Sequence, residues 1–156
     1  KLVVSRPVQP VGKDIGFLPG TLEEKMSPWL MPVQDNLEYL MSGNRSTMEL
    51  MFENGTIEIE ALSYIRGRSI SNAYIIIDEA QNLSVHELKT IITRVGENTK
   101  IILTGDIEQI DNVYLDATSN GLSHAIEKFK SQPLAGHITL KKGERSKTAT
   151  LAAKIL

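Results

Sequence analysis

The chain has 156 residues, enough for one domain with a sizeable core, and its 41% hydrophobic and 23% charged residues are ordinary for a globular protein. Its formal net charge of −2 excludes a general attraction to nucleic acid, so such contact would have to come from local basic clusters. The sequence has no cysteine, no signal peptide and no apolar run long enough to cross a membrane. We therefore expect a soluble, cytoplasmic protein with no membrane partner.

Apolar periodicity predicts the secondary structure in chain order. Strands are expected near residues 1–4, 57–62, 74–78, 100–104 and 137–140, and helices over residues 21–40, 46–52, 84–95 and 119–129 and from residue 146. Residues 8–20 are expected to form a loop, and Pro28 and Pro32 to kink or split the first helix. Ser84 and Glu87 match a capping box. The alternation of strands and helices predicts an α/β fold with a mainly parallel sheet flanked by helices.

Two adjacent carboxylates, Asp78 and Glu79, follow a run of β-branched apolar residues. Such a run is typical of a buried central strand that delivers acid groups to the edge of a parallel sheet. In enzymes that hydrolyse nucleoside triphosphates, the first carboxylate helps to hold Mg²⁺ and the second can orient the attacking water. The alternative is a pair of acids that caps a helix. The length of the apolar run and the following Gln81 favour the metal-and-water interpretation.

The next apolar strand also ends in polar residues, here Thr104, Gly105 and Asp106, with Gln109 shortly after. We expect Asp78 and Asp106 to lie at the same edge of the sheet, because parallel strands end together. These residues could then sense a terminal phosphate, with Gln109 as a neutral hydrogen-bond donor to the phosphate or to the water. The alternative is an ordinary turn, since Gly and Asp are common turn residues.

Four arginines are candidates for contact with phosphate. Arg145 follows the last predicted strand and could neutralise transition-state charge as a finger, in its own or a neighbouring subunit; the alternative is a solvated charged turn. Arg66 and Arg68 flank a glycine and suit the phosphates of a nucleotide or a nucleic acid, or else a salt-bridged loop. Arg6, just past the first strand, has the same two interpretations.

Five short segments carry a resemblance that covers nearly the whole chain: residues 5–7, 16–20, 64–68, 77–82 and 103–111. In combination they resemble the PhoH family of phosphate-starvation-inducible ATPases. Two further segments, residues 116–122 and 142–146, are most similar to the branch in which a PIN ribonuclease domain precedes the PhoH domain. That branch is associated with RNA unwinding and cleavage.

The resemblance implies a RecA-like P-loop NTPase core, similar to the first motor domain of superfamily 1 helicases, with ATP and Mg²⁺ as cofactors. It makes Asp78 and Glu79 the Walker B acids, with Asp78 holding Mg²⁺ through water. It places Gln109 at the end of the sensor motif and makes Arg145 the candidate finger. It also implies RNA as a partner and a ring-like homo-oligomer, with a hexamer among the candidate rings.

The sequence departs from the family in one respect. Family members carry a phosphate loop before the Ser-Arg-Pro strand, whereas no G-x-x-x-x-G-K-[ST] motif occurs in this chain. We therefore expect residues 1–156 to be the C-terminal portion of a single PhoH-like ATPase domain from a longer protein, truncated at the N-terminus and without Walker A or a PIN domain. This portion alone is expected to bind Mg-ATP poorly and to hydrolyse it negligibly.

Two functions compete at this point. The first is the ATPase part of an RNA-directed motor, in which Mg²⁺-dependent ATP hydrolysis is coupled to RNA remodelling. The second is a non-catalytic nucleotide- or RNA-binding assembly module. Glu79 distinguishes the two functions and favours the ATPase, because a module that only binds has no physical need for a carboxylate beside the metal ligand. A small-molecule kinase is a weaker third alternative, since the sequence shows no acceptor pocket.

Overall fold

A computed structural model describes residues 1–7, 22–65, 67–141 and 146–155. The chain divides into two compact units, Lys1–Ala125 and Ile126–Leu156. The first unit holds the sheet and the residues around it, and the second holds the end of one helix and the C-terminal helix. Within the described ranges, no helix is both long and apolar enough to cross a membrane.

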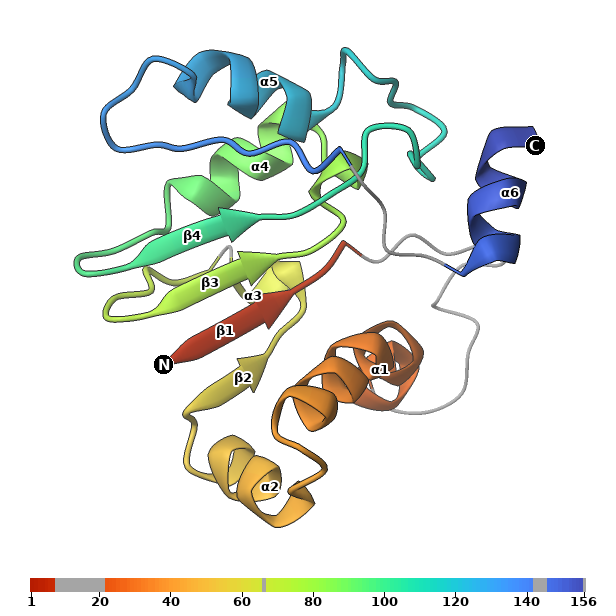
Figure 1. Cartoon of the computed structure of the whole chain (residues 1–156). Helices are drawn as coiled ribbons and strands as arrows, with labels where there is room; N and C mark the ends of the chain where they lie inside the picture. Colours follow the sequence, from red (N-terminus) through yellow and green to blue (C-terminus); the bar gives the residue numbers. More distant parts are fainter. Residues whose placement is uncertain (8–21, 66, 142–145, 156) are drawn as a thin grey trace. The chain divides into compact units, whose positions relative to one another are not determined.

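The first unit is built around a four-stranded sheet in which every strand runs parallel to its neighbours (Figure 1). The strands are β1 (Leu2–Ser5), β2 (Ile57–Ile59), β3 (Tyr74–Ile77) and β4 (Lys100–Leu103), in the order β2-β1-β3-β4. Leu2 lies opposite both Ile57 and Tyr74, and Tyr74 lies opposite Lys100. The four strands are therefore in register, and their carboxyl ends reach the same edge.

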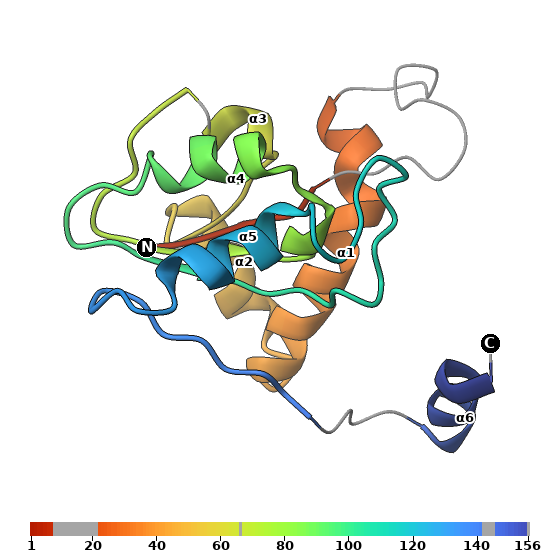
Figure 2. The same cartoon turned by 90° about the horizontal axis from the view of Figure 1, so that it is seen from above.

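Helices connect the strands and flank the sheet. In the first unit they are α1 (Leu22–Leu40), α2 (Arg45–Glu53), α3 (Leu62–Ile65), the 3-10 helix η2 (Ala80–Asn82), α4 (Val85–Ile92) and most of α5 (Gly121–Phe129). The second unit holds the last residues of α5 and the helix α6 (Lys147–Ile155). Figure 2 shows α3 and α4 on the same side of β1. The predicted α/β fold, a mainly parallel sheet flanked by helices, is confirmed.

Apolar side chains of the two central strands form the core. Val3 of β1 and Ile75 and Ile77 of β3 are each at most 1% exposed. Leu88 and Ile91 of α4 are also buried, and their spacing of three residues puts them on one face of that helix. Central strands of a parallel sheet are covered on both faces, which is why β3 reads as a continuous apolar run and not as an alternation.

The start of α4 is held by the predicted capping box. The Ser84 Oγ accepts the N–H of Glu87 at 3.2 Å, and the Glu87 Oε2 accepts the N–H of Ser84 at 3.0 Å. Two backbone donors at the helix start are thereby satisfied. Such a cap contributes about 1 kcal/mol to stability.

Strand β2 and helix α1 differ from the sequence-based expectation. Strand β2 ends at Ile59 and not at residue 62, because the chain turns there into α3. Of the two effects expected at Pro28 and Pro32, the split is wrong, because helix α1 is continuous over Leu22–Leu40, and the kink stays a prediction. The two prolines are four residues apart in the sequence, so the two backbone N–H groups that they lack belong to the same side of a helix.

The strand predicted at residues 137–140 is wrong. These residues have no strand structure, and Ile138 and Leu140 are 83% and 86% exposed. Their polar–apolar alternation suits a strand locally, but strand structure requires hydrogen bonds from a neighbouring strand. In the part of the chain that the structure describes, no strand pairs with this segment. The loop predicted at residues 8–20 lies outside the described residues.

Candidate functional site

The candidate site lies at the carboxyl edge of the sheet, where Arg6 follows β1, Asp78 and Glu79 follow β3, and Thr104 and Asp106 follow β4 (Figure 1). The backbone ladder continues into this edge. The N–H of Asp78 donates to the carbonyl of Ser5 at 2.9 Å, and the N–H of Thr104 donates to the carbonyl of Ile77 at 3.0 Å. Asp78 and Asp106 thus lie at the same edge, as the sequence predicts.

Asp78 is held by the neighbouring strand. Its Oδ1 accepts a hydrogen bond from the Thr104 hydroxyl at 2.8 Å. Its Oδ2 has no hydrogen-bond partner among the residues that the structure describes. The carboxylate is therefore oriented through one oxygen, and no described residue occupies the other.

Glu79 breaks the regular strand geometry. Its φ of 54° and ψ of 37° lie in the left-handed region, which costs a non-glycine residue roughly 1–2 kcal/mol. Neighbouring side chains on a strand point to opposite faces of the sheet. The turn at Glu79 ends that alternation directly after Asp78, and the 3-10 helix η2 follows.

Both oxygens of the Glu79 carboxylate are occupied. Its Oε1 accepts from the Arg6 guanidinium at 3.2 Å, and its Oε2 accepts from the Gln81 amide at 2.6 Å. The side chains of Arg6 and Glu79 are 23% and 31% exposed, so water screens this ion pair only in part. The carboxylate is therefore held from two directions.

The loop after β4 folds back on Asp106. The Asp106 Oδ1 accepts the N–H of Glu108 at 3.0 Å, and its Oδ2 accepts from the Gln109 side-chain amide at 2.5 Å. Gly105 lies just before it, and a Cβ at this position would overlap the Gln81 side chain and Leu122. The close approach of β4 to η2 thus requires glycine at residue 105.

Gln81 is a central residue of the site that the sequence analysis did not name as one. Its side chain is fully buried, and its amide nitrogen donates to Glu79 and to the carbonyl of Gln109, the latter at 2.8 Å. Its Oε1 accepts the N–H of Asp106 at 3.2 Å. The one sequence signal was its position two residues after Glu79.

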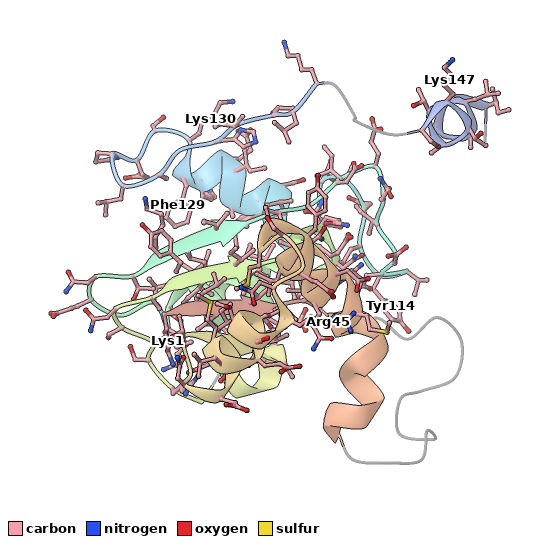
Figure 3. The ribbon with its side chains drawn as sticks, turned by 60° about the horizontal axis from the view of Figure 1, so that its bottom comes forward. Lys1, Arg45, Tyr114, Phe129, Lys130 and Lys147 are labelled. Carbon is pink, nitrogen blue, oxygen red and sulfur yellow. The ribbon has the colours of Figure 1, made fainter. Side chains whose placement is uncertain are left out.

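Asn82, the next residue, anchors a second loop. Its Oδ1 accepts the N–H groups of Asp111 and Asn112 at 2.8 and 3.1 Å, and its carbonyl accepts from the Asn112 side chain at 3.2 Å. The Asn112 side chain in turn accepts the N–H of Tyr114, whose own side chain is 91% exposed (Figure 3). The buried amide of Asn82 therefore shapes the chain between β4 and α5.

Arg68 does not join the acid pair. Its guanidinium binds the carboxylates of Glu58 at 2.9 Å and Glu60 at 2.5 Å, and the Lys1 ammonium binds Glu58 at 2.6 Å. Burial tends to raise the pKa of Glu58, but the hydrogen bonds from Lys1 and Arg68 outweigh it and lower that pKa. This arrangement matches the salt-bridged alternative. Arg66 and Arg145 lie outside the described residues.

The carboxylates of the site could hold Mg²⁺ only together with further ligands. Among the described residues, no three His, Cys, Asp or Glu side chains form a group that could hold a metal ion. Mg²⁺ usually keeps several waters and binds one or two carboxylates plus substrate phosphates. Asp78, one of whose oxygens meets no partner among the described residues, fits that kind of site and does not fit a closed structural metal centre.

Comparison with known proteins identifies relatives over the full chain. The family model described as PhoH-like protein matches residues 1–155. The chain is 56% identical to Protein PhoH2 of Bacillus subtilis (strain 168) over 158 aligned positions, which cover 100% of this chain and 36% of that protein. It is 40% identical to Protein PhoH2 of Mycolicibacterium smegmatis over 157 positions, which cover 100% of this chain and 35% of that protein.

A third relative, Protein PhoH of Escherichia coli (strain K12), is 37% identical over 149 positions, which cover 96% of this chain and 42% of that protein. The chain thus spans about a third to two fifths of the length of these relatives.

Proposed function

Because the chain belongs to the PhoH family and has the parallel α/β sheet of a RecA-like fold, we propose that it supplies the Walker B and sensor side of an Mg²⁺-dependent ATPase whose turnover is coupled to RNA remodelling. One observation supports this most directly. The acids after β3 and the Thr-Gly-Asp segment after β4 meet at one edge of the sheet, where Thr104 donates to Asp78.

Each residue at this edge has a proposed role. Asp78 would hold Mg²⁺ through water with its available oxygen, and Glu79 would orient the attacking water. Thr104 donates to the Asp78 carboxylate, and Gln109 donates to Asp106. Asp106 and Gln109 would face the terminal phosphate. Mg²⁺, when bound, would neutralise negative charge on the phosphates.

The arginines have separate proposed roles. Arg6, Arg66 and Arg68 remain candidates for contact with nucleic-acid or nucleotide phosphate, and Arg145 for the finger. In the structure Arg6 pairs with Glu79, and Arg68 pairs with Glu58 in β2 and with Glu60 just after it. Each of these two arginines would therefore have to release its carboxylate in order to bind a phosphate. RNA as a partner and a ring-like homo-oligomer are supported by the resemblance of the motifs. The absence of cysteine in the sequence fits a cytoplasmic location.

A non-catalytic nucleotide- or RNA-binding module is the alternative, and one observation favours it. The polar groups of the site pair with each other, Arg6 with Glu79 and Gln109 with Asp106, as they would in a site that no longer turns over. Against it stands the backbone strain at Glu79, which a binding module would have no reason to retain.

The substitution Glu79→Gln separates the two functions. It is to be made in the complete natural polypeptide that contains these residues, where Mg-ATP binding and turnover are measured separately. We expect turnover to fall by roughly 100-fold or more, since a group that handles the proton of the attacking water contributes about that much, while the Kd for Mg-ATP changes less than about threefold.

The matched control is Glu97→Gln, which makes the same chemical change at an exposed acid. It should leave both quantities unchanged. Turnover by the Glu79→Gln protein at the unmodified rate, or no Mg²⁺-dependent turnover by the unmodified polypeptide, would favour the binding module instead.

A further inference from the structure

We propose that Gln81 is a positioning residue for Glu79, whose buried amide fixes the carboxylate relative to the loop after β4. This inference rests on the proposed function, because it assigns Gln81 a part in the same reaction. Gln81 itself is fully buried and would not contact the phosphates. It acts through Glu79 on one side and through Asp106 and Gln109 on the other.

Because Gln81 is buried, its amide depends on hydrogen bonds to other protein groups and not to water. A fully buried amide is strongly destabilising unless its donors and acceptor are paired. Here both amide hydrogens have acceptors, the Glu79 carboxylate at 2.6 Å and the Gln109 carbonyl at 2.8 Å. The amide oxygen accepts the N–H of Asp106 at 3.2 Å. The side chain is thus satisfied only in this one arrangement of its partners.

The orientation of the amide follows from the chemistry of those partners. The nitrogen faces two acceptors and the oxygen faces a donor. A flipped amide would set its oxygen against the Glu79 carboxylate and its N–H₂ against the N–H of Asp106, so every contact would become repulsive. Gln81 therefore links the carboxylate of Glu79, the N-cap residue of η2, to the backbone N–H of Asp106 in the loop after β4, and only one orientation of its amide can do so.

Steric limits reinforce this link. Gly105 packs so closely on Gln81 that a Cβ there would overlap the amide oxygen. Glu79 holds a strained left-handed backbone conformation directly beside it. A short hydrogen bond to a carboxylate is charge-assisted and among the stronger kinds, so it can help to hold that strained residue in place.

Arg6 is a competing restraint on Glu79, and the two are not equivalent. The Arg6 contact is longer, at 3.2 Å against 2.6 Å, and its side chain is partly exposed. An arginine on a flexible stem can leave the carboxylate when a phosphate arrives, whereas the buried Gln81 has no solvent to replace its partners. We therefore assign the lasting orientation of Glu79 to Gln81.

Two variants of the complete natural polypeptide test the proposal. Gln81→Met keeps the length of the side chain and removes every polar contact. Gln81→Glu keeps an acceptor for the N–H of Asp106 but loses the donor to Glu79 and Gln109. The controls are Gln34→Met and Gln34→Glu, which make the same changes at an exposed residue of α1.

We expect both Gln81 variants to lower kcat by about 10- to 100-fold, while the KM for ATP changes less than about threefold. Loss of a residue that orients a functional side chain by a hydrogen bond typically has an effect of about this size. A residue with a merely structural role would not separate kcat from KM in this way. Hydrogen exchange gives a second readout without turnover. Protection of the Asp106 amide should be lost in Gln81→Met and retained in Gln81→Glu.

The outcomes are distinguishable. Unchanged kcat in a folded Gln81→Met protein, or a parallel loss of kcat and affinity in both variants, would overturn the positioning role. If Gln81→Met does not fold, Gln81→Glu decides by the same kcat and KM criterion. If the unmodified protein has no turnover that depends on Glu79, the proposed function fails. In that case unchanged Asp106 protection in Gln81→Met would also overturn the link through Gln81.

Discussion

Gly105 offers a direct test of how tightly β4 approaches η2. In Gly105→Ala the new Cβ would lie 2.8 Å from the Leu122 Cδ2 and closer still to the Gln81 Oε1. The leucine methyl can move by a small rotation, but the Gln81 amide is held by three hydrogen bonds. The added methyl must therefore displace either the amide or the strand end.

The expected magnitude follows from overpacking. Extra atoms in a well-packed region cost about 1–3 kcal/mol. In a chain of this size each kcal/mol lowers Tm by about 2–4 °C, so Gly105→Ala should lower Tm by about 2–12 °C. Because the amide also holds Glu79, ATP turnover should fall together with stability.

Thermal unfolding and steady-state turnover of the complete natural polypeptide are measured beside a matched control, Gly136→Ala. A Cβ at residue 136 would meet nothing within 4 Å, and alanine there should leave Tm unchanged or raise it slightly. If Gly105→Ala and Gly136→Ala unfolded at the same temperature, the close approach of residue 105 to Gln81 would be refuted. Lowered Tm with unchanged turnover would refute only the link from Gln81 to catalysis.

Two further predictions concern charge. Hydrogen bonds from the Thr118 hydroxyl, and then from the N–H groups of Ser119 and Thr118, lower the pKa of Asp116 from 3.8 to about 2. Since this pKa is depressed in the folded state, its stabilisation is present above about pH 4 and is lost as the pH falls toward 2. The urea midpoint of Asp116→Asn should therefore lie below that of the unmodified protein at pH 6 and converge with it near pH 2, and a constant difference would contradict this. For the proposed finger, Arg145→Ala in the complete polypeptide should keep ATP binding and lose turnover by roughly 1,000-fold or more, and mixing it with Glu79→Gln should restore activity if the arginine acts in a neighbouring subunit. No recovery despite demonstrated subunit exchange would place Arg145 in its own site or make it a structural charge.

Much of the fold could be predicted from local patterns. Strands β3 and β4 were expected within one residue of their observed ends, because each is a short β-branched run bounded by polar residues. The capping box at Ser84 was equally local, since its two partners are three residues apart. The position of the acids followed from the rule that parallel strands end at one edge.

The partners of the charged and amide side chains were not predictable in the same way. Arg6 and Glu79 are separated by 73 residues, and the sequence offers no local sign that they pair. Arg68 had both a phosphate and a salt-bridge interpretation, and the structure shows it on Glu58 and Glu60. Gln81 was noted as a neighbour of the acids, yet its contacts with Asp106 and Gln109 span 25 and 28 residues.

The failed strand at residues 137–140 shows the same limit. Its alternation satisfies the local rule for a strand, but a strand exists only where a second strand supplies hydrogen bonds, and the described structure places none beside it. The sequence alone determined the secondary structure of the core and the edge at which the acids emerge, because short-range periodicity and strand direction decide both. Only the tertiary structure decided which side chains hold Glu79 and Asp106, because those contacts depend on distances between segments that lie far apart in the chain.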